Sequence, residues 1–190
     1  MKFDEIIKKR KSVHAFKNKK VKWKDILIAV DSANQGPFAS NLNNLKFIII
    51  EEKEKIKQIA EDSDQLWITE ASSLIVVCSN EKDLENIYDE RGRVYSRQQA
   101  GAAINTLLLK LTDLGISSCW VGSYDDHLVR LHLEIPKNIN IEAIIPVGYE
   151  SGNTSKKRKR PLEGKVYWET WDSSKRPTLI KDPKDRYSLA

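Results

Sequence analysis

Three side chains near the N-terminus combine a fixed positive charge, a hydroxyl and an imidazole at alternating positions. They are Arg10, Ser12 and His14. Alternate residues of an extended chain point to the same side, so all three could face one anionic group. A second concentration of positive charge is the run Lys156–Arg160. We expect a phosphate site if the fold brings these two segments together, whereas Arg10 by itself would be an ordinary solvated charge.

The usual backbone signatures of phosphate binding are missing from the sequence. No glycine-rich loop precedes a Lys-Ser or Lys-Thr pair, and no G-x-G-x-x-G opens a helix. The hydrolase signatures G-x-S-x-G and H-E-x-x-H are missing too. A phosphate ligand would therefore be held by side chains rather than by a nest of backbone amides.

The composition predicts a folded protein without a membrane segment. The 190 residues are 40% hydrophobic and 31% charged, which is too apolar for a disordered chain. This length suits one domain with an appended segment. No run approaches the roughly 18 apolar residues of a membrane span, and the first residues lack the apolar centre of a signal peptide. These features predict a cytoplasmic protein.

The net charge of +5 comes from a single short segment, the basic run Lys156–Arg160. Without the five residues of the basic run, the sequence would hold equal numbers of basic and acidic side chains. A protein that coats nucleic acid needs a continuous basic face, so we expect no nucleic-acid partner. The alternative is a nucleic-acid-binding module in which Lys156–Arg160 contact phosphates while Trp168 and Trp171 stack on bases.

Cysteine and histidine are too sparse to indicate a metal site. Cys78 and Cys119 each stand alone in an apolar segment, where cysteine usually behaves as a small buried hydrophobe. The three histidines show no metal-binding spacing, so we expect no metal. No side chain is predicted to act as a catalytic acid, base or nucleophile.

Hydrophobic patterning defines the elements that would position these groups. Apolar residues three and four apart predict helices, and short β-branched runs predict buried strands. The predicted helices span 3–11, 23–34, 53–63 and 98–114, followed by a short one that begins at Asp125 or Asp126 and ends at Leu133. The predicted strands span 46–50, 73–78, 118–121, 139–147 and 165–168. This mixture favours an α+β fold with helices on both faces of a sheet.

The predicted helix over 98–114 is apolar almost all round. Ile104 and Leu107 belong to its apolar stripe, and the opposite face carries the small residues Gly101 and Ala102. Such a helix lies within a core or is covered by another subunit. The polar tail after Trp171 carries two prolines, and we expect it to be disordered alone or to pack as an arm on a neighbouring subunit.

Several segments resemble, in order, those of the FMN-dependent nitroreductase family. R-K-S-V-H-A-F at 10–16 is similar to the family's R-R-S-x-R-x-F, and 33–47 is similar to A-x-x-A-P-S-x-x-N-x-Q-P-W-x-F. N-T-L-L-L at 105–109 and L-G-I-S-S-C-W-V-G at 114–122 are similar to N-L-L-L and L-G-L-G-S-C-W-I-G. I-P-V-G-Y at 145–149 and R-P-L-E at 160–163 match later blocks. The resemblance spans residues 3–171.

This resemblance implies a homodimer built on a central, mostly antiparallel sheet flanked by helices. Residues 1–171 would form the FMN-binding domain and 172–190 a C-terminal arm, with one FMN in each of two sites at the subunit interface. The residues implied to contact FMN are Arg10, Ser12, His14, Asn41, Gln65, Val121, Gly122, Lys157 and Lys159. The alternate pair Arg158 and Arg160 stays open as the phosphate contact.

The implied activity is ping-pong hydride transfer through FMN, from NADH or NADPH to nitroaromatics, quinones or related small acceptors. Related alternatives are a flavin reductase, a dehalogenase, and a flavoprotein that binds FMN without turnover. His14 stands where the family usually has Arg or Lys, and Phe38 stands where Ser is usual, which would alter FMN affinity. Residues 43–45 replace the common Gln-Pro-Trp and would change the range of acceptors.

Overall fold

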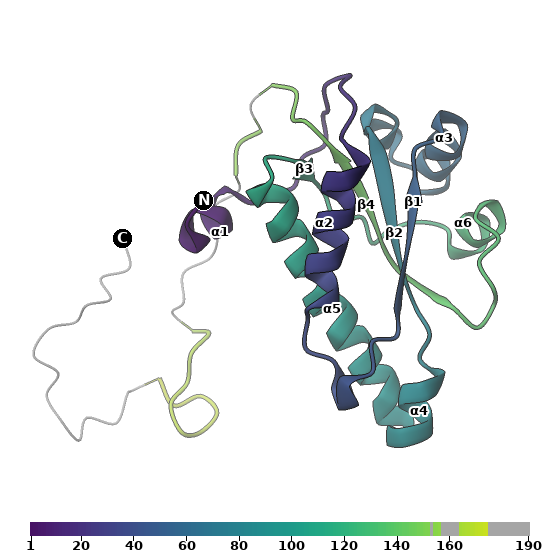
Figure 1. Cartoon of the computed structure of the whole chain (residues 1–190). Coiled ribbons are helices and arrows are strands. Elements are labelled where there is room, and N and C mark those ends of the chain that lie inside the picture. Colours follow the sequence, from purple (N-terminus) through teal and green to yellow (C-terminus); the bar gives the residue numbers. More distant parts are fainter. Residues whose placement is uncertain (153, 157–163, 175–190) are drawn as a thin grey trace, which may run out of the picture. The chain divides into compact units, whose positions relative to one another are not determined.

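A four-stranded antiparallel sheet forms the centre of the unit Met1–Lys156 in the computed structural model (Figure 1). Its strands are β1 (Leu45–Ile50), β2 (Ser73–Ser79), β3 (Ser117–Ser118) and β4 (Asn140–Gly148). They lie in the order β1-β2-β4-β3, and each neighbouring pair is antiparallel. The predicted α+β class with a mostly antiparallel sheet is confirmed.

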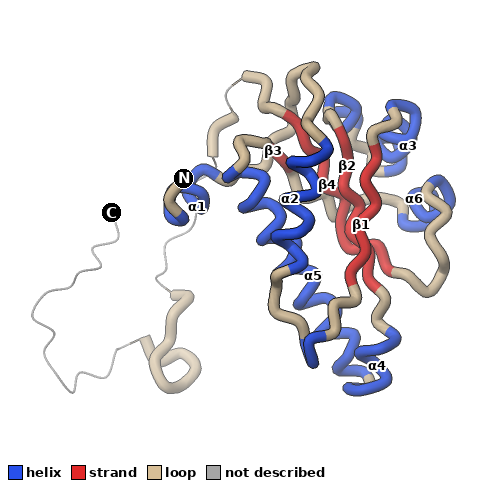
Figure 2. Tube along the Cα trace, viewed as in Figure 1, coloured by secondary structure: helices blue, strands red, loops and turns tan. Residues whose placement is uncertain are grey.

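Helices cover both faces of this sheet, as the apolar strands predicted. The structure describes residues 1–152, 154–156 and 164–174. Its helices are α1 (Phe3–Lys9), α2 (Trp23–Asn34), α3 (Lys53–Asp62), α4 (Lys82–Tyr88), α5 (Glu90–Asp113) and α6 (Asp126–His132), with short 3-10 helices η1 (Ala39–Asn41) and η2 (Leu66–Glu70). α2 and α5 lie on one side of the sheet, and α3 and α6 on the other (Figure 2).

Strand β2 joins two apolar cores because its side chains alternate between the faces. Ile75 and Val77 pack with α2 and α5, whereas Leu74 and Val76 pack with α3. All four are fully buried. Each such side chain stabilises the fold by roughly 1.5–3 kcal/mol relative to an exposed one. Because both faces of β2 are buried, its backbone is held rigidly, and so are the residues next to its two ends.

Helix α5 is longer than predicted. It begins at Glu90 rather than at residue 98, because the polar segment before Gln98 has no apolar stripe yet continues the helix. Ile104 and Leu107 are fully buried, which confirms the predicted stripe. The polar helix α4, which the patterning missed, precedes α5 directly.

Three other predicted elements differ from the structure by more than one residue at an end. The first helix ends at Lys9 instead of Lys11, because Arg10 is already extended. The predicted strand over 118–121 is the two-residue β3, after which Val121 forms an isolated bridge with Ile144. The predicted strand over 165–168 is wrong: these described positions hold a turn, two residues without regular structure and a bend.

The second unit, Lys157–Ala190, is described only over 164–174. Lys157, Lys159 and the alternate pair Arg158 and Arg160 lie outside the described residues, as does most of the predicted arm over 172–190. The predicted boundary after residue 171 therefore stays a prediction. In the part of the chain that is described, no helix is long and apolar enough to cross a membrane.

Candidate functional site

The segment that follows α1 runs beside strand β3. Ser12 forms a parallel bridge with Ser118, and the Val13 N–H donates to the Ser118 carbonyl over 3.2 Å. Val13 is buried and anchors the segment, while Ser12 and His14 are exposed. The extended conformation predicted for this segment is thus fixed by pairing with β3.

His14 and Ser12 lie against Cys119, the residue after β3, and Arg10 is near enough for its charge to act on the thiol. The Cys119 Sγ lies 3.4 Å from His14 Nε2. Burial raises the pKa of the Cys119 thiol, and the neighbouring Ser12 side chain and the positive charge of Arg10 offset part of that rise. One place in the molecule therefore gathers a guanidinium, a hydroxyl and an imidazole.

Gln65, the residue before η2, reaches the turn that follows Cys119. Its Nε2 donates to the Ser123 carbonyl over 3.2 Å. The indole of Trp67 packs edge-on against the His14 ring, with the ring centroids 4.6 Å apart. The turn after β3, which carries Val121 and Gly122, is thus joined to both η2 and the segment after α1.

Val121 and Gly122, neighbours in this turn, differ in burial and in their backbone contacts. Val121 is buried, and its N–H and carbonyl bond to Ile144 over 2.9 and 3.0 Å. Gly122 is exposed, and a Cβ there would meet only the Trp120 Nε1, 4.0 Å away. The backbone at Gly122 is therefore the part of the turn that a flat ligand can approach closely.

Within one chain, Asn41 does not lie near Arg10, Ser12 and His14. It lies on η1, just before β1, and β1 begins where Leu45 pairs with Ser79 at the far end of β2. The segment after α1 lies instead near the start of β2, where Ser73 pairs with Val147. Since β2 has seven residues, these two ends are roughly 20 Å apart. In Figure 1, β3 and α4 mark the two opposite ends.

The start of the basic run lies beside the end of α1. Lys156 Nζ donates to the carbonyls of Ile7 and Lys8 over 3.0 and 2.7 Å. Arg10 follows two residues later. The residues of the run that were predicted to bind phosphate lie beyond Lys156, outside the described part, so their convergence with Arg10 stays a prediction.

The family model described as "Nitroreductase: Nitroreductase family" matches residues 7–81 and 59–149, well over half of the sequence. The chain belongs to the nitroreductase family. The matched ranges contain every described residue of the predicted site, from Arg10 to Gly122, so the resemblance drawn from short segments is confirmed.

Relatives of this nitroreductase-family chain carry two kinds of name. It is 27% identical over 161 residues to "Iodotyrosine deiodinase" of Thermotoga neapolitana, across 76% of this chain and 87% of the relative. It is 29% identical over 150 residues to "Putative NADH dehydrogenase/NAD(P)H nitroreductase" of Archaeoglobus fulgidus, across 76% and 83%. Its fold matches the FMN-dependent nitroreductase of Clostridium difficile R20291 with a TM-score of 0.75 at 20% identity, across 87% and 98%.

Sequence patterning missed two neighbours of His14 in this nitroreductase-family site. Cys119 was expected to be only a buried thiol, and it is buried and free, but its sulfur also contacts His14. The position of Trp67 in the sequence gave no indication of this contact, because nothing in the spacing links it to His14, about fifty residues earlier. Only the S-C-W sequence at 118–120 could have pointed to Cys119.

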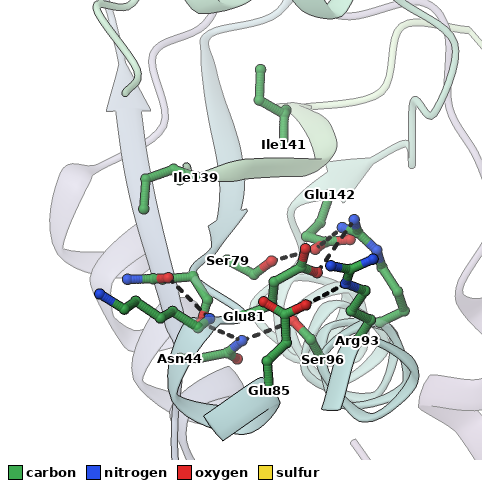
Figure 3. Close-up of polar contacts among 12 residues, drawn as sticks. Asn44, Ser79, Glu81, Glu85, Arg93, Ser96, Ile139, Ile141 and Glu142 are labelled. Carbon is green, nitrogen blue, oxygen red and sulfur yellow. Dashed lines mark hydrogen bonds and ion pairs between the residues drawn. The ribbon is translucent and has the colours of Figure 1, made fainter. Parts of the chain in front are cut away.

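Carboxylates gather instead at the other end of the sheet (Figure 3). Glu142 accepts hydrogen bonds from the Ser79 hydroxyl and from Arg97, and Glu85 pairs with Arg93. These pairs join β2, β4, α4 and α5 and serve as structural contacts. Among the described residues, no group of three histidine, cysteine or acidic side chains could hold a metal ion.

The ion pair of Lys11 with Glu150 supports the segment that carries the site. Lys11 Nζ lies 2.9 Å from Glu150 Oε1 and 2.7 Å from the Thr154 carbonyl. Burial alone would raise the pKa of Glu150, but hydrogen bonds from Lys11 and Thr154 outweigh it and lower the pKa below the ordinary value. A lowered carboxyl pKa stabilises the fold above the unfolded-state pKa, and that contribution is lost as the pH falls through the folded-state pKa.

We therefore expect Lys11→Met to lower the free energy of unfolding by about 1 kcal/mol at pH 7. The difference from wild type should shrink as the pH falls below the usual glutamate pKa of about 4.3. Urea denaturation at several pH values measures this. Lys20→Met is the matched control, because Lys20 pairs with Glu51 while its side chain is 74% exposed. A loss from Lys11→Met that is equal at pH 7 and pH 3.5 would contradict the assignment.

Proposed function

We propose that this protein is an FMN-dependent NAD(P)H oxidoreductase that reduces nitroaromatics, quinones or related small acceptors. The observation that carries the proposal is the gathering of His14, Ser12 and Arg10 around Cys119, which is followed three residues later by the open backbone of Gly122. Family membership makes an oxidoreductase the expected class. The names of relatives and the FMN dependence of a structural neighbour support the cofactor and the donor.

The residues present fit a flavin that carries a phosphate. A guanidinium binds phosphate oxygens through two parallel hydrogen bonds, and the Ser12 hydroxyl and His14 ring add donors. Gly122 leaves room for close contact with a planar ring. When bound, FMN would supply the redox chemistry, accepting a hydride from NAD(P)H and passing it to the acceptor.

The protein's own groups would orient the cofactor and tune its charge. Positive charge from Arg10 favours a reduced flavin that carries negative charge. Gln65 would hydrogen-bond the ring or the ribityl chain, and its bond to the Ser123 carbonyl holds it in place. No acid or base from the protein is required, since solvent can supply protons to the acceptor.

A homodimer completes this site in our proposal. Asn41 lies at the far end of the sheet in its own chain, so it would reach a flavin only across an interface with a second copy. Large apolar side chains stay exposed on α1 and α2 in a single chain, among them Phe3 at 65%, Leu27 at 45% and Ile28 at 46%. Exposed apolar patches of this kind mark protein interfaces.

The deciding test is a visible absorption spectrum of the purified protein. We expect flavin absorbance, its loss on anaerobic addition of NADH or NADPH, and its return on addition of a nitroaromatic or quinone. A colourless protein that does not take up added FMN would overturn the proposal. Bound FMN that neither donor bleaches would instead indicate a flavoprotein without this activity.

Reductive dehalogenation is a second candidate, favoured by the 27% identity to a protein named iodotyrosine deiodinase. The two activities differ in what leaves the substrate. Incubation of the reduced protein with 3-iodotyrosine should release iodide if the second candidate holds, and an ion-selective electrode measures it. Turnover of nitroaromatics and quinones without any iodide release would favour the first.

Thiol labelling gives an independent check on where FMN binds. Burial raises the pKa of Cys78 to about 11 and also raises that of Cys119. Because the thiolate is the reactive form, alkylation by iodoacetamide should be slow at pH 7 and faster at pH 9. We expect saturating FMN to slow alkylation of Cys119 at pH 9 about tenfold or more and to leave Cys78 unchanged. Mass spectrometry of the peptides separates the two, and equal protection of both would contradict the location.

A further inference from the structure

We propose that Gln99 is a positioning residue for flavin binding, because its side-chain amide fixes the turn that carries Asn41. This inference rests on the proposed function, in which Asn41 contacts FMN across the subunit interface. Gln99 lies on α5 and is 4% exposed. It therefore acts through Asn41 rather than by touching the cofactor.

The amide of Gln99 spans η1 from one side to the other. Its Oε1 accepts a hydrogen bond from the Ala39 N–H over 3.2 Å, and its Nε2 donates to the Leu42 carbonyl over 3.1 Å. Ala39 begins η1, and Leu42 follows its last residue, Asn41. A single planar group thus fixes both ends of the turn.

The turn needs such support because its backbone is strained. Ser40 has a φ of 49°, in the left-handed region that serine rarely adopts, and Asn41 follows in the same region with a φ of 56°, which asparagine tolerates better. Conformations of this kind persist only where surrounding contacts hold them. Besides Gln99, the Ser40 hydroxyl bonds to the Tyr88 hydroxyl of α4 over 2.6 Å. Asn41 itself is exposed, so its side chain is free to meet a ligand while its backbone is held.

A buried second layer fixes which way the Gln99 amide faces. Gln99 Nε2 also donates to Asn44 Oδ1 over 2.6 Å. Asn44 Nδ2 in turn donates to the Ser96 hydroxyl over 2.8 Å and to the Asn80 carbonyl over 3.0 Å (Figure 3). Because Asn44 and Ser96 are buried, a reversed Gln99 amide would leave buried groups without partners, and such groups are costly. The network therefore permits one orientation.

The consequence is that the turn is ordered before any ligand binds. A residue already held in its binding conformation loses less conformational entropy on binding, so affinity is higher. Removing the Gln99 amide leaves the Asn41 side chain unchanged, but the backbone of η1 loses the hydrogen bonds that hold it. The loss of FMN affinity should then be no larger than the loss caused by removing the Asn41 side chain.

The test is a double-mutant cycle read out as the Kd for FMN, measured by titrating the full-length apoprotein with the cofactor. We expect Asn41→Ala and Gln99→Met each to raise the Kd about tenfold, the size of one hydrogen bond. The double variant should be no more than about threefold weaker than either single variant, because both remove the same interaction. Independent effects, giving roughly a hundredfold for the pair, would overturn the proposal.

Ile104→Val is the matched control for general loss of stability. Ile104 is fully buried on the same helix, and its truncation weakens packing without removing any of the hydrogen bonds that hold η1. We expect its thermal stability to fall while its FMN Kd stays at the wild-type value. A Gln99→Met protein that behaves like this control, with unchanged Kd, overturns the inference while the proposed function stands.

Gln99→Glu keeps the test decisive if Gln99→Met does not fold. It retains an acceptor for the Ala39 N–H but cannot donate to the Leu42 carbonyl, so we expect an intermediate Kd and an altered visible circular dichroism of bound FMN. Wild-type Kd and spectrum in this variant would overturn the inference. Failure of the wild-type protein to bind FMN at all would instead defeat the proposed function.

Discussion

Replacing Arg10 by glutamine should raise the Kd for FMN by about 10- to 100-fold, which corresponds to the 1.5–3 kcal/mol of a hydrogen bond to a charged group. Arg10 is half-buried and lies close enough to Cys119 to shift its pKa. Glutamine keeps two donors and much of the length but removes the charge. The lost affinity would therefore report the charge and the forked geometry of the guanidinium.

The measurement is quenching of FMN fluorescence during titration of the apoprotein at fixed ionic strength. Lys9→Gln is the matched control, because Lys9 is an exposed cation one residue away, at the end of α1. We expect a change of less than about threefold there, since exposed charges are screened by salt. Similar losses in both variants would show that net charge, rather than a site at Arg10, governs FMN affinity.

The Arg10 site could be predicted from sequence because its geometry is local. Alternation in an extended segment puts Arg10, Ser12 and His14 on one side whatever the rest of the chain does. The segment that they meet, from Leu114 to Gly122, could be located only through its resemblance to a family signature. Hydrophobic periodicity alone did not show that Ser118 of β3 would pair with Ser12.

Other parts of the site depend on tertiary contacts that no local pattern encodes. Gln99 is one polar residue at the start of an apolar stripe, and nothing in its spacing shows that it reaches η1, which lies about sixty residues earlier. Asn41 was predicted to contact FMN only through the family resemblance, and its distance from Arg10 within one chain follows from sheet topology. Within a single chain Asn41 lies far from Arg10, so only the dimer that the family resemblance implies links Asn41 to the flavin.

Errors in the predicted elements have similar physical causes. The run at 165–168 has the β-branched and aromatic residues of a strand, but a strand also needs a neighbouring strand to satisfy its backbone, and no strand forms at these described positions. The start of α5 was missed because residues 90–97 are polar. Helix propensity and contacts with α4 extend the helix there without an apolar stripe.

Those contacts predict a large effect at Gly92, which is buried in the first turns of α5. A Cβ at this position would lie 2.4 Å from both the carbonyl carbon and the carbonyl oxygen of Leu84, and 2.5 Å from the Glu85 nitrogen. These atoms belong to the backbone of α4, so no rotamer change can relieve the clash. Gly92→Ala should lower the free energy of unfolding by about 2–3 kcal/mol, even though alanine is the better helix former.

Thermal denaturation should show the loss as a fall in Tm of about 5–10 °C for a protein of this size. Arg91→Ala, an exposed change one residue away, should shift the Tm by only 1–2 °C, as surface substitutions of about 0.5 kcal/mol do. Equal shifts would mean that α4 and α5 do not approach as closely as the structure has them. Because α4 also carries Tyr88, which holds Ser40, a displaced α4 should loosen η1. Gly92→Ala should then weaken FMN binding as well, whereas Arg91→Ala should leave it unchanged.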